Sequence, residues 1–235
     1  MMKLDSRVGE ADGPTLGQEI NLMDCYPKAN RPITERGQKS TAEHIALAAQ
    51  FGKDYFDGSR LTGYGGYHYH PRFWTDTVRR FRHHYDLADD ARILDVGCAK
   101  GFMLHDFGLL MPKADLVGLD ISEYALAHAK PEVADNLLLG NARSLPFEDK
   151  SFDLVISINT IHNLEPDECE MALAEIARVS KQHAFVMVDA WHNDEEKQRM
   201  TDWNLQARTV QHVDDWKSMF ARCGYTGDYW WFIAT

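Results

Sequence analysis

The chain has 235 residues, of which 44% are hydrophobic and 26% are charged, and its formal net charge is -11. This length suits one domain with a full core, and no segment approaches the roughly 18 uncharged apolar residues that span a membrane. The polar N-terminus lacks the basic and then apolar order of a secretory signal. The four cysteines lie far apart without a CxxC pair, which favours reduced thiols in the cytoplasm.

The negative net charge comes from one part of the chain. Residues 1–92 contain 13 Lys and Arg and 13 Asp and Glu, whereas residues 93–235 contain 12 and 23. An acidic body repels phosphate backbones, so the composition disfavours a general nucleic-acid binder. Nine of the thirteen N-terminal cations are arginine, which leaves room for a local anion site there.

The N-terminal part shows weak and then stronger helical signals. Residues 1–38 are polar and punctuated by glycine and proline, which predicts an irregular arm. The capping-box pattern Ser40 to Glu43 predicts the start of a helix that ends at Gly52. A second helix is predicted by apolar residues spaced by four, three and four, which are Trp74, Val78, Phe81 and Tyr85.

From residue 92 onward, short apolar runs alternate with helical patterns. Such alternation predicts an α/β fold with a doubly wound, mostly parallel Rossmann-like sheet of six or seven strands. We expect an N-terminal arm and cap over residues 1–90 and a ligand-binding domain over 91–235. The predicted strands are 92–96, 115–120, 137–140, 152–158, 184–189 and 228–234, and the predicted helices are 101–111, 122–130, 166–179 and 212–223.

The turn after the first strand reads ILDVGCAKGF. A turn of this kind opens the crevice of a doubly wound sheet, where helix amides are free to bind a ligand. The dinucleotide fingerprint GxGxxG fails twice, because Ala99 and Phe102 replace its second and third glycines. An NAD-dependent oxidoreductase therefore remains only as an alternative.

Three sequence blocks resemble the class I S-adenosylmethionine-dependent methyltransferases. DVGCAKG resembles their first motif, with Ala99 in place of the usual middle glycine, and LVGLDIS resembles the second. GNARSLPFEDKSFDLVISINTIHNL resembles the third and fourth motifs together. The resemblance covers residues 92 to about 190 and implies S-adenosylmethionine as the cofactor. It departs from the family at the C-terminus, where one strand is recognisable instead of an antiparallel hairpin.

The resemblance also implies roles for single residues. The glycine-rich turn would contact the methionine part of the cofactor, the acid that ends the second strand would bind ribose, and the following residues would flank adenine. An asparagine after the fourth strand would stand near the sulfonium. The residues concerned are Asp95, Gly97, Ala99, Gly101, Asp120, Ile121, Asn141, Ala142 and Asn159. The alternative is that they only shape the turns, which favour Gly, Asn and Asp in any case.

Candidate acceptor and catalytic residues follow the fourth and fifth strands. His162 is a candidate general base, because the pKa of a histidine is close to neutrality. A carboxylate acceptor needs no base, and His162 is alternatively a packed residue at a strand end. Trp191 and His192 lie at the crevice edge, or else in a solvated loop with one core aromatic. The acidic run 194–196 predicts a helix start.

The stretch GYGGYHYHPRFW, residues 63–74, is called the aromatic segment below. His68 and His70 alternate along the chain, but two histidines make an incomplete metal site, so no metal is expected. Aromatic rings beside Arg72 are able to stack on bases, which the acidic body disfavours. Plain packing of an arm is a further alternative.

We prefer to interpret the aromatic segment as a lid, because the resembling family commonly places a cap at this position. Its glycines supply hinges and its rings exclude water. Tyr67 is a candidate for the cofactor carboxylate, and the candidates for acceptor binding are Tyr64, Tyr69, His70 and Arg72.

The sequence therefore predicts methyl transfer to a small polar metabolite, such as a sugar, a nucleotide-sugar, an amine or a carboxylate. A protein or tRNA methyltransferase and a catalytically silent cofactor-binding subunit are the alternatives. The expected partner is a small-molecule acceptor, without a membrane or nucleic acid. The oligomeric state stays open, and a homodimer is among the options.

Overall fold

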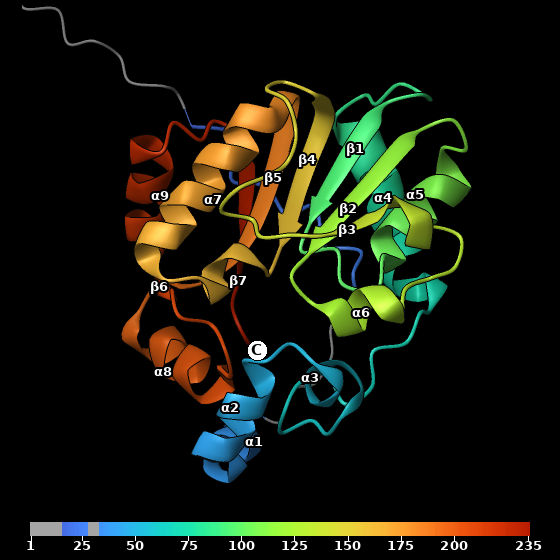
Figure 1. Ribbon diagram of the computed structural model, residues 1–235. Coiled ribbons are helices and arrows are strands. Elements are labelled where there is room, and N and C mark those ends of the chain that lie inside the picture. Colours follow the sequence, from blue (N-terminus) through green and yellow to red (C-terminus); the bar gives the residue numbers. More distant parts are fainter. Residues whose placement is uncertain (1–15, 28–32) are drawn as a thin grey trace, which may run out of the picture.

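A computed structural model describes residues 16–27 and 33–235, and its centre is a parallel sheet (Figure 1). The described residues form seven strands in the order β3-β2-β1-β4-β5-β6, and β7 also pairs with β5. Every strand pairing is parallel, as the sequence predicts for most of the sheet. The strands are β1 (Arg92–Val96), β2 (Asp115–Asp120), β3 (Leu137–Leu139), β4 (Phe152–Ile158), β5 (Ser180–Trp191), β6 (Gln211–His212) and β7 (Asp228–Phe232).

Helices cover both faces of the sheet and its carboxyl edge. In Figure 1, α7 and α9 lie on one face, α4 and α5 lie on the other, and α1, α2, α3 and α8 lie beyond the carboxyl ends of the strands. The helices are α1 (Ile33–Lys39), α2 (Ala42–Ala48), α3 (Lys53–Asp57), α4 (Pro71–His84), α5 (Phe102–Leu110), α6 (Glu123–Ala127), α7 (Pro166–Val179), α8 (Asp194–Trp203) and α9 (Val213–Arg222). Two 3₁₀ turns are Ala134–Asn136 and Ile161–Asn163.

The apolar runs of the sequence become strands that are buried on two sides. Neighbouring residues of β1 point to opposite faces, so Ile93 packs in the core beneath α4 and α5 while Leu94 packs in the core beneath α7 and α9. Both side chains are 0% exposed. A strand covered on both faces has no polar side, which explains why these segments are apolar throughout instead of alternating.

The predicted elements of the sheet agree closely with the structure. The expected bounds of β1, β2, β4 and α7 are confirmed to the residue, and the predicted fold class is confirmed. The strand expected at 184–189 is longer, because β5 runs from Ser180 to Trp191. Its first residues are half-buried or exposed, so they lack the apolar signal that marks the rest of the strand.

The C-terminal edge of the sheet holds two strands beside β5. β7 pairs with Phe185 to Asp189, and the two-residue β6 pairs further along the same strand, with Ala190 and Trp191. The described residues therefore contain no antiparallel hairpin at this edge. On the outer side of β7, Glu19 forms a parallel bridge with Tyr229, which attaches the N-terminal arm to the sheet.

The N-terminal arm departs from its prediction in two ways. Residues 33–39 of the arm, expected to be irregular, form α1; residues 1–15 and 28–32 lie outside the described part of the chain. The capping box is shifted by one residue, since Thr41 caps the amide of His44 and the His44 ring accepts from the Thr41 amide. The helix ends at Ala48, and Gly52 instead precedes α3.

Helix α4 shares its core with the sheet. The predicted apolar face is confirmed, because Trp74, Val78 and Phe81 are buried in the cluster that also contains Ile93. The Phe81 ring meets Phe185 of β5 edge to face, with ring centroids 5.1 Å apart. Helix α4 thus supplies part of the core that it shares with the sheet. No helix in the described residues is long and apolar enough to cross a membrane.

We expect Phe81→Ala to lower the free energy of unfolding by about 3–5 kcal/mol, because it removes a fully buried ring from a shared core. Urea denaturation followed by circular dichroism measures this loss. Ile45→Ala, at a side chain that is 44% exposed, is the control and should change stability by at most about 0.5 kcal/mol. Equal losses in the two variants would show that α4 does not belong to the cooperative core.

Candidate functional site

A cavity of about 1370 Å³ opens at the carboxyl ends of the central strands, bordered by the aromatic segment, α1 and α8. It exceeds the roughly 300–1,000 Å³ that is usual for a single-ligand pocket, so it has room for two ligands. Most residues predicted for the site line it. These are Asp95, Gly97, Ala99, Asp120, Ile121, Asn141, Ala142, Asn159, Tyr64, Tyr67, Arg72, His162 and His192.

The turn after β1 is fixed by Asp120 at the end of β2. Its carboxylate accepts hydrogen bonds from the amides of Ala99 at 2.7 Å and Ser122 at 2.8 Å. Ala99 has a left-handed φ of +50°, an uncommon conformation for a residue with a side chain. A Cβ at Gly97 would come within 2.0 Å of Thr160 Oγ1, so only glycine fits between β1 and the turn after β4.

Asp95 places a second buried carboxylate near the first. Burial and the charge of Asp120 raise the pKa of Asp95 to about 7. No described residue donates a hydrogen bond to its carboxylate, whereas buried polar groups are normally paired. Asp95 therefore offers acceptor oxygens to a ligand that carries N–H or O–H groups.

Two asparagines after β4 also present unpaired oxygens. The Oδ1 atoms of Asn159 and Asn163 are buried, and neither has a hydrogen-bond partner among the described residues. Both side chains line the cavity, and Asn159 has a left-handed φ of +53°. Unpaired buried acceptors are costly, which points to a ligand that donates hydrogen bonds to them.

His162 lines the cavity and is buried, with 3% of its surface exposed. The amide of Asp189 donates to its Nδ1 at 3.0 Å. Nδ1 must therefore carry a lone pair, and the proton of the neutral ring lies on Nε2. Burial lowers the pKa of His162 to about 3. In this state the ring is a hydrogen-bond donor through Nε2, and it has no free lone pair with which to accept a proton.

A buried ion pair attaches the aromatic segment to the turn after β1. Lys100 Nζ lies 2.8 Å and 2.9 Å from the two carboxylate oxygens of Asp57 and donates to the Tyr67 carbonyl at 3.1 Å. The Tyr124 hydroxyl and the Tyr67 amide also donate to Asp57. Although burial raises the pKa of Asp57, these hydrogen bonds outweigh that effect and lower it to about 2.

Aromatic contacts continue this attachment. The Tyr67 ring stacks on Phe102 at the start of α5, with centroids 4.8 Å apart, and Tyr64 contacts Tyr67 at 4.6 Å. A Cβ at Gly63 would come within 1.9 Å of the Tyr55 carbonyl oxygen, so the segment needs glycine where it crosses α3. The segment thus contributes Tyr64 and Tyr67 to the cavity wall, and contacts with α3 and α5 hold their rings.

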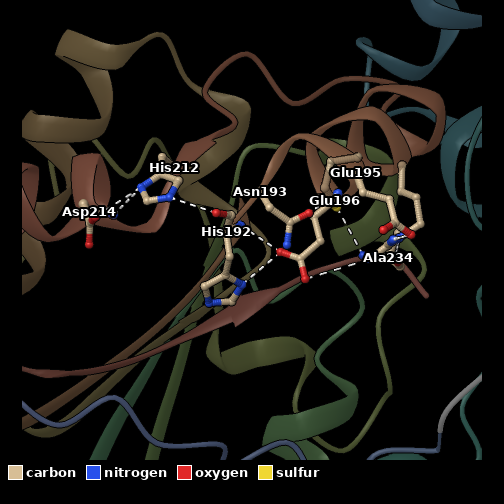
Figure 2. A network of polar contacts seen from close by, with 9 residues as sticks. His192, Asn193, Glu195, Glu196, His212, Asp214 and Ala234 are labelled. Atoms are coloured by element: carbon tan, nitrogen blue, oxygen red, sulfur yellow. Dashed lines mark hydrogen bonds and ion pairs between the residues drawn. The ribbon is translucent and has the colours of Figure 1, made fainter.

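The loop from β5 into α8 is held by its own polar network (Figure 2). The Nδ1 atom of His192 lies 2.9 Å from Glu196 Oε2, and the Asn193 side chain caps the amide of Glu196. His212 Nε2 lies 3.1 Å from the His192 carbonyl oxygen. The helix predicted to start at the acidic run is confirmed as α8. His192 borders the cavity, but Glu196 fixes its ring.

Four residues predicted for the site do not line the cavity. Gly101 begins α5 with φ +71° and faces Val133, so packing explains its glycine. Tyr69 contacts His105, and burial together with the nearby Asp106 carboxylate raises its pKa to about 12. His70 caps α4 through Nδ1, and Trp191 packs on His212 and Lys197.

The sequence interpretation missed several residues of the site, including Asn163 and Arg60 on the cavity wall. Asp57 and Lys100 are far apart in sequence, so no local pattern predicts that they pair. A lysine within an otherwise apolar turn does, however, indicate that a partner for its charge lies elsewhere in the chain. Arg36 lines the cavity from α1, within the arm predicted to be irregular.

The cavity fits S-adenosylmethionine, which has a ribose, an adenine and a charged methionine end. Asp95 and Asp120 supply carboxylates for donor groups, and Ile121, which is 53% exposed, supplies an apolar surface beside them. The unpaired Asn159 oxygen lies at the end of β4, in the middle of the edge. These residue types match the parts of the cofactor.

Comparisons with known proteins agree with this fit. A family model described as a methyltransferase domain matches residues 94–188. The malonyl-[acyl-carrier protein] O-methyltransferase of Legionella pneumophila is 31% identical over 54% of this chain and 45% of its own length. A protein of Encephalitozoon cuniculi that bears a methyltransferase name is 30% identical over 60% of this chain and 70% of its own. The YcgJ protein of Bacillus subtilis shares the fold, with a TM-score of 0.51 at 22% identity over 61% of this chain and 65% of its own.

The chain therefore belongs to the class I S-adenosylmethionine-dependent methyltransferases. S-adenosylmethionine is the cofactor of this class, and the residues of the cavity fit it. Because the chain spans less than half the length of the Legionella enzyme, the acceptor does not follow from the comparison.

We expect Asp57→Asn to release the aromatic segment, because it leaves the buried Lys100 ammonium without its counter-charge. Breaking such a pair costs about 3 kcal/mol or more. Limited proteolysis should cut residues 60–74 faster, and urea denaturation should show the loss of stability. Asp76→Asn, in the exposed pair with Arg79, is the matched control.

The pH dependence follows from the same pair. The pKa of Asp57 is lowered to about 2 from 3.8, so its contribution to stability is present above about pH 4 and is lost as the pH falls toward 2. Asp57→Asn should flatten the acid-unfolding curve in this window. Equal proteolysis and equal acid curves for the two variants would contradict the anchoring role.

We expect the His162 ring to stay neutral from about pH 8 to about pH 5, because its burial opposes the charge. NMR correlations of the ring Cε1–H group, assigned by comparison with His162→Gln, measure this. The same group should titrate near pH 6.5 in the urea-unfolded chain, so folded stability falls as the pH drops below about 6.5. A titration midpoint near 6.5 in the folded protein would restore His162 as a candidate base.

Proposed function

We propose that the enzyme transfers the methyl group of S-adenosylmethionine to a small polar metabolite, such as a sugar, a nucleotide-sugar, an amine or a carboxylate. The observation that carries the proposal is the buried, unpaired amide oxygen of Asn163 on the cavity wall, next to Asn159, which is assigned to the cofactor. This oxygen can accept a hydrogen bond from a hydroxyl or amine group of the methyl acceptor. A purely apolar methyl acceptor would leave it without a partner.

In this proposal, the role of each residue depends on its position along the sheet edge. Asp95, Gly97, Ala99, Asp120, Ile121, Asn141, Ala142, Asn159 and Tyr67 would hold the cofactor, which supplies a methyl group already activated on a sulfonium. The protein then mainly aligns the acceptor, and alignment alone lowers the barrier by several kcal/mol. The aromatic segment excludes water from the transfer. Residues 1–90 act as arm and cap in this proposal, and residues 91–235 act as the cofactor-binding domain.

We assign His162 a different role from the predicted one. Its buried, neutral ring would donate from Nε2 to an oxygen of the acceptor and so orient it. This role suits an acceptor whose reacting oxygen or nitrogen needs no base from His162, such as a carboxylate. The remaining candidates for acceptor contact on the cavity wall are Tyr64, Arg72 and His192.

Two alternative functions would give different experimental results. The names of relatives mention acceptors as different as an acyl-carrier protein and a tRNA uridine, so a macromolecular acceptor is the first alternative. The net charge of -11 speaks against tRNA. A silent cofactor-binding subunit is the second alternative. A cytoplasmic location and a homodimer remain predictions.

A methyl-label screen tests the proposal. The enzyme is incubated with labelled S-adenosylmethionine and either metabolite pools or macromolecular fractions, and mass spectrometry locates the label. Label in a small metabolite supports the proposal. Label in tRNA or protein contradicts it, and cofactor binding without S-adenosylhomocysteine formation in any fraction favours the silent subunit.

We expect Asp120→Ala to weaken S-adenosylhomocysteine binding by about 1.5–3 kcal/mol, roughly 10- to 150-fold, because a charged hydrogen-bond acceptor is lost. Isothermal titration calorimetry measures the affinity. Asp115→Ala, at the other end of the same strand, is the control and should bind as the wild type does. Unchanged affinity in Asp120→Ala would refute its place in the cofactor site.

A further inference from the structure

The cavity wall formed by α1 carries an arginine without a counter-charge. Arg36 Nε is buried and has no hydrogen-bond partner among the described residues, and none of their carboxylates pairs with this guanidinium. Its neighbours on the wall differ, because Lys39 is paired with Glu35 and Arg199 with Glu195. An unpaired, half-buried cation is costly, so its retention calls for a binding partner.

The surroundings of Arg36 are shaped for a planar guanidinium. The group lies over the Trp203 ring of α8, with Cζ 4.2 Å from the ring centroid. Burial, with a smaller contribution from the charge of the nearby Arg60, lowers the pKa of Arg36 to about 10, although Tyr55 and Tyr64 oppose the shift. Arg36 therefore stays charged at neutral pH. Arg60 is exposed and also lines the cavity, and neither arginine forms an ion pair with a carboxylate of the described residues.

The position separates this cluster from the cofactor end of the cavity. Arg36 and Trp203 sit where α1 packs beside α8, and α8 follows β5 (Figure 1). Asp120 ends β2, and the sheet order places β1 and β4 between β2 and β5. Arg36 thus lies toward the far end of the edge from the proposed ribose site, on the other side of Asn159.

We propose that Arg36 and Arg60 form an oxyanion subsite for the methyl acceptor, so that the substrate carries a carboxylate or phosphate group in addition to its hydrogen-bond donors. This inference rests on the proposed function and narrows it to anionic acceptors. A guanidinium can donate two parallel hydrogen bonds to a carboxylate or to a phosphate. The Trp203 ring would fix the orientation of the Arg36 guanidinium. Of the acceptor classes proposed above, this inference excludes neutral sugars and simple amines, because they carry no anionic group.

Anion binding by the whole chain tests the subsite. Calorimetric titrations use inorganic phosphate, pyrophosphate and succinate as probes, with and without saturating S-adenosylhomocysteine, and the two chemical kinds of probe separate a phosphate from a carboxylate preference. We expect wild-type protein to bind at least one probe and Arg36→Ala to weaken that binding about tenfold or more. Arg60→Ala should weaken it less, because its side chain is exposed. Arg36→Lys should recover part of the loss, since the charge stays but the planar fork is gone.

Arg79→Ala is the matched control, because it removes an exposed arginine paired with Asp76 outside the cavity. It should bind the probes as the wild type does. Equal binding in Arg36→Ala and Arg79→Ala overturns the inference. A tenfold loss of S-adenosylhomocysteine affinity in Arg36→Ala also overturns it, since the arginine would then hold the cofactor carboxylate. Failure of the wild type to bind S-adenosylhomocysteine refutes the proposed function instead, while the probe titrations without cofactor still test the subsite.

Discussion

The buried ion pair between Lys100 and Asp57 is the contact on which the cavity depends. Lys100 belongs to the turn that begins the cofactor crevice, and Asp57 ends α3 in the N-terminal part. Tyr124 and Tyr67 complete the coordination of the carboxylate, so the pair is buried with its hydrogen bonds satisfied. A buried lysine without such partners would be too costly to keep. The turn after β1, the end of α3 and the aromatic segment are therefore joined in one polar network.

This connection explains why the N-terminal part and the sheet together form the cavity. The sheet supplies strand ends with Asp95, Asp120 and Asn159, and the N-terminal part supplies rings and cations. Along the edge, Asp95 and Asp120 lie at the β1 and β2 end, whereas Arg36 lies on α1, which packs beside α8 after β5. Glu35 and Glu196 also line the cavity, but they pair with Lys39 and His192. Under the proposals above, the unpaired Arg36 would attract an anionic acceptor.

The sequence predicted the sheet well, because strands buried on both faces are continuous apolar runs with sharp polar ends. Thirteen of the expected site residues line the cavity, and ten of them lie at or after the ends of parallel strands, which share one edge. The sequence interpretation failed for Tyr69 and His70, because alternation along an extended segment does not show which face meets the body and where the next helix begins. It also missed the pair of Asp57 and Lys100 and the role of Arg36, which arise only when distant segments pack together.

The docking of the N-terminal arm on β7 has a consequence for solubility. An edge strand with free amides and carbonyls is a template for pairing with another molecule. Here the Ile20 amide donates to the Tyr229 carbonyl, and the Tyr229 amide donates to the Gln18 carbonyl. Asp228 fixes the arm by accepting from the Gln18 amide and by contacting His84 and Tyr85. The arm therefore acts as a built-in guard against edge-to-edge aggregation of a strand whose sequence, DYWWF, is rich in aromatic residues.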